Sequence, residues 1–276
     1  MPQAPIFSVL IASMGGAQLL NALLSIHDTG CTDYEVVLVI DKPGLNDSVL
    51  GLTELPFDLR QRIKVIHNDK NMGVTLSLNK GLEQCQGEII CRLDDDDCFL
   101  PSRFSLLQKH SQAHQDVDVF TGAAVVKNSS GDHYTQHIPR SHKEIVLGLE
   151  RRNILIHSAL NIRRNALIAV GGYNNEFYYA QDYELYLRLI RRGVQFFGIT
   201  QPIVLRSEGE DTITVKKRRH QSLYSLSALS LHHARSWGVI ERSPMLVTHG
   251  FIRFATPQIL RRMVRKIRGL RKTVRL

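Results

Sequence analysis

The sequence predicts an α/β fold built on a mostly parallel sheet. Strand-like runs alternate with helix-like segments through the first half of the chain, the order that places helices against a parallel sheet. The runs are almost continuously apolar, as expected of strands buried on both faces. With 276 residues, of which 43% are hydrophobic, the chain can build one large core.

The first half has the more regular pattern. Runs rich in β-branched residues predict strands, and an Ala/Leu-rich segment after the first of them predicts a helix. The expected strands are 6–12, 34–41, 63–67, 88–93 and 117–126, and the expected helices are 17–26, 74–85 and 101–114.

The second half is less regular. In the helix expected at 180–192, Tyr183, Tyr186, Leu187 and Ile190 form an apolar stripe, and Gly193 ends it. The other expected helices are 163–170 and 214–237, and the expected strands are 157–162, 194–199 and 203–206. We divide the chain into a domain at 1–240, with halves at 6–127 and 128–240, and a tail at 241–276.

Composition limits the classes of function. The four cysteines lack the CxxC spacing of zinc or redox sites, which favours reduced thiols in a cytosol. Nine of the 35 Lys and Arg residues lie in 251–276, so residues 1–250 contain 26 basic and 26 acidic residues. The net charge of +9 therefore comes from the tail, and a generally basic nucleic-acid surface is excluded.

Four adjacent aspartates, Asp94 to Asp97, follow the strand expected at 88–93. Such carboxylates repel one another unless solvent or a cation compensates them, so the run is a candidate site for a hard metal ion. Continued strand geometry would place Asp94 and Asp96 on one side and Asp95 and Asp97 on the other. A solvated acidic turn is the alternative interpretation of the run alone.

Polar residues follow the other expected strands as well. Ser13 follows the first strand, Asp41 ends the second, and Asn71 and Gly73 follow the third. Ligands bind beyond the carboxyl ends of parallel strands, so these residues and the aspartate run should share a crevice. Asp41 can accept a hydrogen bond from a base imide or a ribose hydroxyl, although Asp is also common in turns.

An ordered set of motifs runs through about residues 6–220. The motifs are the strands at 7–12 and 35–41, Asn68-Asp-Lys-Asn-Met-Gly73 with Asn79-Lys-Gly81, residues 87–97, Leu100-Pro-Ser-Arg-Phe104, Gly171-Gly-Tyr173, and residues 180–188. Each motif is weak alone, but in this order they resemble family 2 glycosyltransferases of the GT-A fold, a Rossmann-like sheet flanked by helices.

The resemblance implies a nucleotide-sugar donor, most often a UDP-sugar, bound with Mn²⁺ or Mg²⁺. It implies that Asp41 contacts the uracil, Asp94 the ribose or a metal-bound water, and Asp96 the metal. Arg206 replaces a late histidine of the family beside the diphosphate. We therefore expect a donor and metal site made of Ser13, Asp41, Asn71, Gly73, Asp94, Asp95, Asp96 and Arg206.

The acceptor hydroxyl must lose its proton as it attacks, which requires a carboxylate or His on the opposite face of the donor. The resemblance implies that Asp182 is this base, with Glu184 in reserve. An Asp at the start of a helix is also favourable without any catalytic role. Gln181 and His157 are expected on the acceptor side, and a structural histidine is the alternative for His157.

The tail contains apolar residues at helical spacing from residue 256 onward, with Arg and Lys at the other positions. This pattern predicts a basic amphipathic helix that binds an anionic membrane surface through residues 252–276. A helix docked on the domain with a solvated basic face is the first alternative, and an RNA-binding tail is the second.

Together these features predict a UDP-sugar hexosyltransferase at the cytoplasmic face of the inner membrane. We expect an inverting transfer of one hexose or N-acetylhexosamine to a lipid-linked glycan acceptor in bacterial cell-surface polysaccharide synthesis, such as that of O-antigen, capsule or exopolysaccharide. A metal-dependent nucleotidyltransferase and a noncatalytic nucleotide-sugar-binding module are the alternatives.

Overall fold

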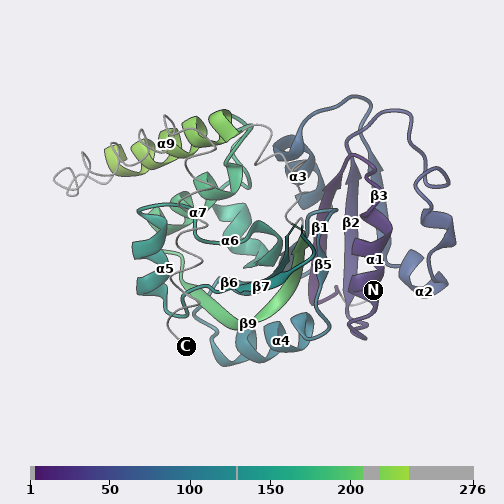
Figure 1. The fold of residues 1–276 in the computed structure, drawn as a ribbon, viewed down its shortest axis with the longest axis horizontal. Helices are drawn as coiled ribbons and strands as arrows, with labels where there is room; N and C mark the ends of the chain where they lie inside the picture. The colour runs from purple at the N-terminus through teal and green to yellow at the C-terminus, as the bar shows by residue number, and fades with distance from the viewer. Residues whose placement is uncertain (1–3, 129, 208–217, 236–276) are drawn as a thin grey trace.

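The computed structural model describes residues 4–128, 130–207 and 218–235, and it confirms the predicted α/β fold (Figure 1). Its strands are β1 Phe7–Ser13, β2 Tyr34–Ile40, β3 Ile63–His67, β4 Ile89–Arg92, β5 Cys98–Phe99, β6 Val119–Lys127, β7 His133–Gln136, β8 Leu160–Arg163 and β9 Phe196–Ser207. Its α-helices are α1 Leu19–His27, α2 Phe57–Arg60, α3 Val74–Leu82, α4 Arg103–Ala113, α5 His142–Leu149, α6 Arg164–Ala169, α7 Gln181–Arg191 and α9 Arg218–Arg235. Two short 3₁₀ turns are η1 Leu52–Glu54 and η2 His157–Ala159.

The strands form one sheet in the order β3-β2-β1-β4-β8-β6-β9-β5, with β7 paired to β6. The first four strands are parallel, as expected for β-α-β connections. The direction reverses at β8, which is antiparallel to both β4 and β6. Because of this reversal, the chain that enters β8 lies beside the chain that leaves β4, and the two segments meet at one edge of the sheet.

Helices cover both faces of the sheet (Figure 1). Alternate residues of β1 point to opposite faces, so Val9 and Ile11 belong to one apolar core and Leu10 to the other. The first core contains side chains of α1, α2 and α4, and the second contains side chains of α3, α5, α6, α7 and α9. This double cover explains the almost continuous apolar runs of the strands.

The structure corrects several expected elements. The strands expected at 194–199 and 203–206 form the single strand β9, which passes an irregularity in its pairing with β6 near Gly122 and Ala123. Residues 157–159 form the turn η2 rather than the start of a strand. The short elements α2, β5, β7 and α5 were not expected, although the capping box of Ser141 and Glu144 indicates the start of α5.

The tail at 241–276 lies outside the described residues, so its predicted helix stays a prediction. Within the described ranges, no helix is both long and apolar enough to cross a membrane.

Candidate functional site

The carboxyl ends of the parallel strands bring several predicted residues together. Ser13, the last residue of β1, donates from its hydroxyl to Asp95 Oδ2 at 2.5 Å. The Ser13 oxygen also accepts from the backbone N–H of Gly15, which fixes the turn after β1. Asn71 is exposed, and its amide nitrogen lies 3.5 Å from the Met14 sulfur of that turn. These contacts bring together the turns that follow β1, β3 and β4.

Asp41 organises the loop between β3 and α3. Its carboxylate is buried and accepts hydrogen bonds from Asn68 Nδ2 at 2.8 Å, Met72 N at 2.7 Å and Gly73 N at 2.8 Å. Gly73 has a φ of 85°, in the left-handed region that favours glycine. This backbone lets its N–H face Asp41 immediately before α3 begins.

The aspartate run forms a turn between β4 and β5 rather than a continued strand. The backbone N–H of Asp97 donates to the carbonyl of Asp94 at 3.2 Å, and both carboxylates lie within hydrogen-bond distance of the Ser158 hydroxyl. The expected alternation is therefore wrong, because the turn brings Asp94 and Asp97 together. Ser158 enters the site from η2, at the place where the sheet reverses direction.

The charges within the run are not equivalent. Burial would raise the pKa of Asp94, but Arg92, His157, Ser158 and Arg206 outweigh it and lower the pKa. The Arg92 guanidinium donates to Asp94 Oδ1 at 2.5 Å. Burial and the charge of Asp94 raise the pKa of both Asp96 and Asp97, that of Asp96 to about 6. The uncompensated negative charge is therefore concentrated on the carboxylates after Asp94.

The carboxylates of the aspartate run, Asp94 to Asp97, fit a divalent cation. Their hard oxygen atoms are the ligands that Mg²⁺ prefers, and a cation would relieve the repulsion that raises the pKa of Asp96. In the part of the chain that the structure describes, no three His, Cys, Asp or Glu side chains form a metal site by themselves.

Arg103 supports this site through hydrogen bonds to the segments that carry it. The sequence did not predict Arg103 as a functional residue. Its fully buried guanidinium donates to the carbonyls of Arg92, Ser158 and Leu160 and to Asn161 Oδ1. Burial lowers its pKa to about 10, which leaves it protonated at neutral pH. Arg103 belongs to the Leu100-Pro-Ser-Arg-Phe104 motif, which had no assigned role in the sequence. The motif thus joins the strand before the aspartates to the turn that contains Ser158.

His157 belongs to η2 and contacts the segment that precedes α7. Its Nε2 is 2.9 Å from the Tyr173 hydroxyl. Burial and the charge of Arg92 lower the pKa of His157, while the charges of both Asp94 and Asp182 act on it in the opposite direction. The electrostatic surroundings of His157 therefore include one carboxylate of the aspartate run and one carboxylate of α7.

Asp182 and Glu184 have different surroundings on α7. Asp182 is half-buried and accepts from Asn153 Nδ2 at 2.7 Å. Glu184 is buried in a paired interaction with Arg188, whose Nη2 lies 2.8 Å from Glu184 Oε2. Gln181 is half-buried at the first position of the helix. Asp182 is thus the more available carboxylate, and Asn153 is a supporting residue that the sequence did not suggest.

The residue before α7 has an unusual backbone. Ala180 has a φ of 53°, and among the described residues no other residue besides glycine has a positive φ. This conformation costs an alanine about 1 kcal/mol or more, and such strain is frequent near functional sites. Ala180 is 1% exposed, so packing around it maintains the turn that presents Gln181 and Asp182.

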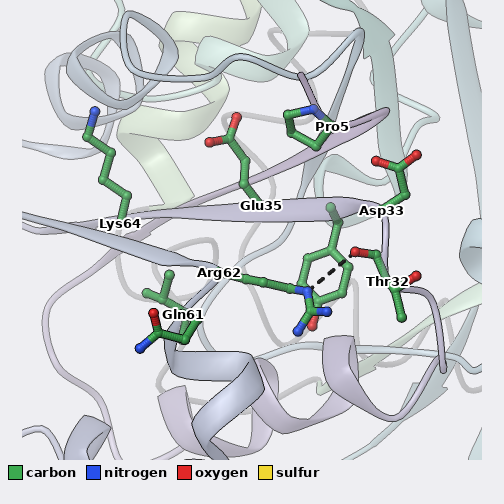
Figure 2. A pocket seen from close by; sticks show the side chains of 9 residues that line it. Pro5, Thr32, Asp33, Glu35, Gln61, Arg62 and Lys64 are labelled. Atoms are coloured by element: carbon green, nitrogen blue, oxygen red, sulfur yellow. Dashed lines mark hydrogen bonds between the residues drawn. The ribbon is translucent and has the colours of Figure 1, made fainter. Parts of the chain in front are cut away.

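An open pocket of about 540 Å³ lies elsewhere, at the amino ends of β2 and β3 (Figure 2). Its charged residues already have partners: Arg62 donates to the Thr32 carbonyl, and Glu35 accepts from the Ser8 hydroxyl. The candidate site lies at the carboxyl ends of the strands, where Ser13, Asp41 and the aspartate run are found. This pocket is therefore separate from the candidate site.

In sequence, the chain is similar to known glycosyltransferases. The family profile described as "Glycosyl transferase family 2" matches residues 8–187. The chain is 28% identical over 263 residues to the amylovoran biosynthesis glycosyltransferase AmsE of Erwinia amylovora, covering 94% of this chain and 93% of AmsE. It is also 28% identical to an Escherichia coli UDP-Gal:alpha-D-GlcNAc-diphosphoundecaprenol beta-1,3-galactosyltransferase, covering 83% and 82% of the two chains.

Solved structures show the same fold. Residues 1–349 of S. aureus TarS, in a crystal structure with UDP-GlcNAc, superpose with a TM-score of 0.66 at 14% identity. The match covers 90% of this chain and 72% of that one. In another, longer TarS structure, with a TM-score of 0.61, this chain spans 43% of the TarS length. The expected GT-A architecture is confirmed.

Proposed function

Because this chain belongs to glycosyl transferase family 2, we propose that it transfers one hexose or N-acetylhexosamine from a UDP-sugar to an acceptor hydroxyl, with inversion. The observation that carries the proposal is the arrangement around His157. Its neighbour Ser158 donates to Asp94 at 2.7 Å, and His157 itself lies 2.9 Å from the Tyr173 hydroxyl in the segment that leads to Asp182. A reacting sugar between these two carboxylates would have a diphosphate site on one face and a base on the other.

Asp41 is the proposed contact for the uracil. Three hydrogen bonds from Asn68, Met72 and Gly73 occupy its carboxylate, which has about four acceptor positions. One position is left for the imide N–H of a base. The TarS complexes with UDP-GlcNAc and UDP support a uridine donor. Ser13, Asn71, Gly73 and Asp95 are the proposed neighbours of the nucleotide.

Asp96 and Asp94 are the proposed ligands of Mn²⁺ or Mg²⁺. A bound divalent ion would act as a Lewis acid that stabilises the negative charge of the departing diphosphate. Arg206 is half-buried, and its charge acts on Asp94, Asp96 and Asp97. We assign it to the diphosphate, because a guanidinium forms paired hydrogen bonds with phosphate oxygens.

Asp182 is the proposed general base. Its carboxylate would remove the proton of the attacking hydroxyl, and the Asn153 amide would hold the carboxylate in place. One positioned base is sufficient for a single in-line displacement, which inverts the anomeric centre. The ion pair with Arg188 makes Glu184 a weaker candidate. His157 and Gln181 would line the acceptor side.

We propose a lipid-linked glycan acceptor in the synthesis of a bacterial surface polysaccharide. The diphosphoundecaprenol-linked substrate in the name of the E. coli relative and the amylovoran role in the name of the Erwinia relative support this class. Such an acceptor would require the enzyme at the cytoplasmic face of the inner membrane. The nine basic residues within 251–276 support attachment to anionic lipid through residues 252–276.

The test is a screen of UDP-hexoses and UDP-N-acetylhexosamines for UDP release, with Mn²⁺, with Mg²⁺ and with EDTA. We expect release from one donor class, dependence on the metal, and loss of most activity in Asp96→Asn. Asp116→Asn is the matched control, because Asp116 is exposed after α4. Full transfer in EDTA would reject the metal, and release of pyrophosphate instead of UDP would reject the reaction class.

A further inference from the structure

Two side chains of α3 bind the segment that leads to Asp182. We call Thr75 and Asn79 the α3 clamp, and residues 171–180 the α7 entry loop. The Thr75 hydroxyl donates to the Phe177 carbonyl at 2.9 Å, and this contact is buried. Asn79 Nδ2 donates at 2.8 Å both to the Tyr173 carbonyl and to Asn175 Oδ1. The clamp thus joins the nucleotide half of the chain to the half that contains the proposed base.

The contact of Asn79 closely restricts the position of the Tyr173 backbone. Its Oδ1 accepts from the Tyr173 N–H at 2.8 Å while its Nδ2 donates to the carbonyl of the same residue, so the amide pairs with Tyr173 as a neighbouring strand would. Gly172 lets the loop approach, because a Cβ at this position would lie 2.6 Å from Asn79 Oδ1. Its φ of 66° also favours glycine.

Both ends of this connection reach the candidate site. The backbone N–H of Gly73, immediately before α3, donates to Asp41 at the proposed uracil position. At the other end, the Tyr173 hydroxyl lies 2.9 Å from His157 Nε2, and the entry loop ends at Ala180, two residues before Asp182. A chain of direct contacts therefore runs from the proposed donor-binding loop through the clamp to the start of α7.

We propose that Thr75 and Asn79 are positioning residues, which set the place of Asp182 relative to the bound donor. The inference rests on the proposed function of Asp182 as the base. A base works only within hydrogen-bond distance of the proton that it removes, and a displacement of about 1 Å can slow a reaction by about 10²-fold. Asp41 holds the loop from which α3 begins, and α3 holds the segment that leads to Asp182. The same helix would therefore position both the donor and the base.

The test compares Asn79→Asp and Thr75→Val with wild type. Asn79→Asp keeps the acceptor for Tyr173 N–H but places a carboxylate oxygen opposite the Tyr173 carbonyl and Asn175 Oδ1. Thr75→Val keeps the shape and removes the donor to Phe177. The matched controls are Asn165→Asp and Thr53→Val, at exposed positions. We expect Asn79→Asp to slow transfer about 10- to 100-fold, with UDP affinity within about threefold of wild type.

Two further measurements separate positioning from general destabilisation. Amide hydrogen exchange should become faster in the entry loop of Asn79→Asp but stay unchanged in β1 and β2. In an Asp182→Asn background, Asn79→Asp should cause little further loss of rate, because the two residues would act through one step. Additive losses, unchanged exchange, or a normal transfer rate in both clamp variants would overturn the proposal.

The exchange measurement needs no turnover. It therefore tests the contacts between the α3 clamp and the α7 entry loop even if the enzyme accepts no UDP-sugar as a substrate. Failure of the wild-type enzyme to release UDP would reject the proposed function, whereas faster loop exchange alone would still support the structural link. If Asn79→Asp does not fold, Thr75→Val provides the same comparison without any change in charge.

Discussion

Replacement of Arg103 by lysine should destabilise the protein strongly, even though the charge is kept. The guanidinium is 0% exposed and donates to four acceptors, which belong to β4, η2 and β8. A lysine offers three N–H groups from one nitrogen and cannot match that spread. Each buried acceptor left unpaired costs about 1–3 kcal/mol, so the loss of two costs about 2–6 kcal/mol, with about 3–5 kcal/mol as the central range.

Urea unfolding monitored by circular dichroism measures this loss directly. A change of about 3–5 kcal/mol is a large part of the 5–15 kcal/mol typical of folded domains. Arg140→Lys is the matched control, since Arg140 is exposed and should change the unfolding free energy by less than about 0.5 kcal/mol. If Arg103→Lys unfolds within about 1 kcal/mol of wild type, the four acceptors do not depend on the guanidinium as argued.

Three other outcomes are expected. Asp182→Asn should slow transfer about 10²- to 10⁴-fold with UDP affinity within about threefold; near-normal turnover, or an α-linked product from a UDP-α-sugar, would contradict this. Deletion of 252–276 should abolish sedimentation with anionic liposomes but not UDP release; binding of the truncated form at low salt would contradict the anchor. Acid should destabilise the packing of α9, because burial and the charge of the neighbouring His233 lower the pKa of His232 from 6.5 to about 4. The unfolded state then binds the proton more readily than the folded state. The contribution of neutral His232 to the free energy of unfolding is therefore fully present above about pH 6.5 and falls by up to about 3 kcal/mol toward pH 4. Hydrogen-exchange protection of α9 at pH 7 and pH 5, each relative to the intrinsic exchange rate at that pH, tests this, and His232→Phe should remove the difference in protection.

The parallel half of the sheet could be predicted because a short stretch of sequence is enough to identify each of its strands. Each strand there is an apolar run followed at once by a polar residue, so Ser13, Asp41 and the aspartate run could be assigned to one edge. The same reasoning failed for the geometry within the run. A turn and the hydroxyl of Ser158, 61 residues away from Asp97, bring Asp94 and Asp97 together, and no local pattern contains that contact.

The supporting residues were missed for a related reason. Arg103 and Asn153 look like ordinary surface residues in the sequence, and only long-range contacts give them a role. The left-handed backbone of Ala180 is also invisible in sequence, since alanine normally favours a helix. The structure has the single strand β9 where the sequence predicts two strands, because Pro202 and the polar residues before it are typical of a break between strands.

The pairing of β5 with β9 has a consequence for the order in which the protein can fold during synthesis. Cys98 pairs with Leu205, so the strand that follows the aspartates has to wait for more than 100 further residues. At roughly 5–20 residues per second, that delay is about 5–20 seconds on the ribosome. The strands β1 to β4 can associate before then, while Arg103 still lacks Ser158 and Asn161. We therefore expect a nascent chain that stops near residue 130 to have a nucleotide-side sheet but no finished aspartate turn.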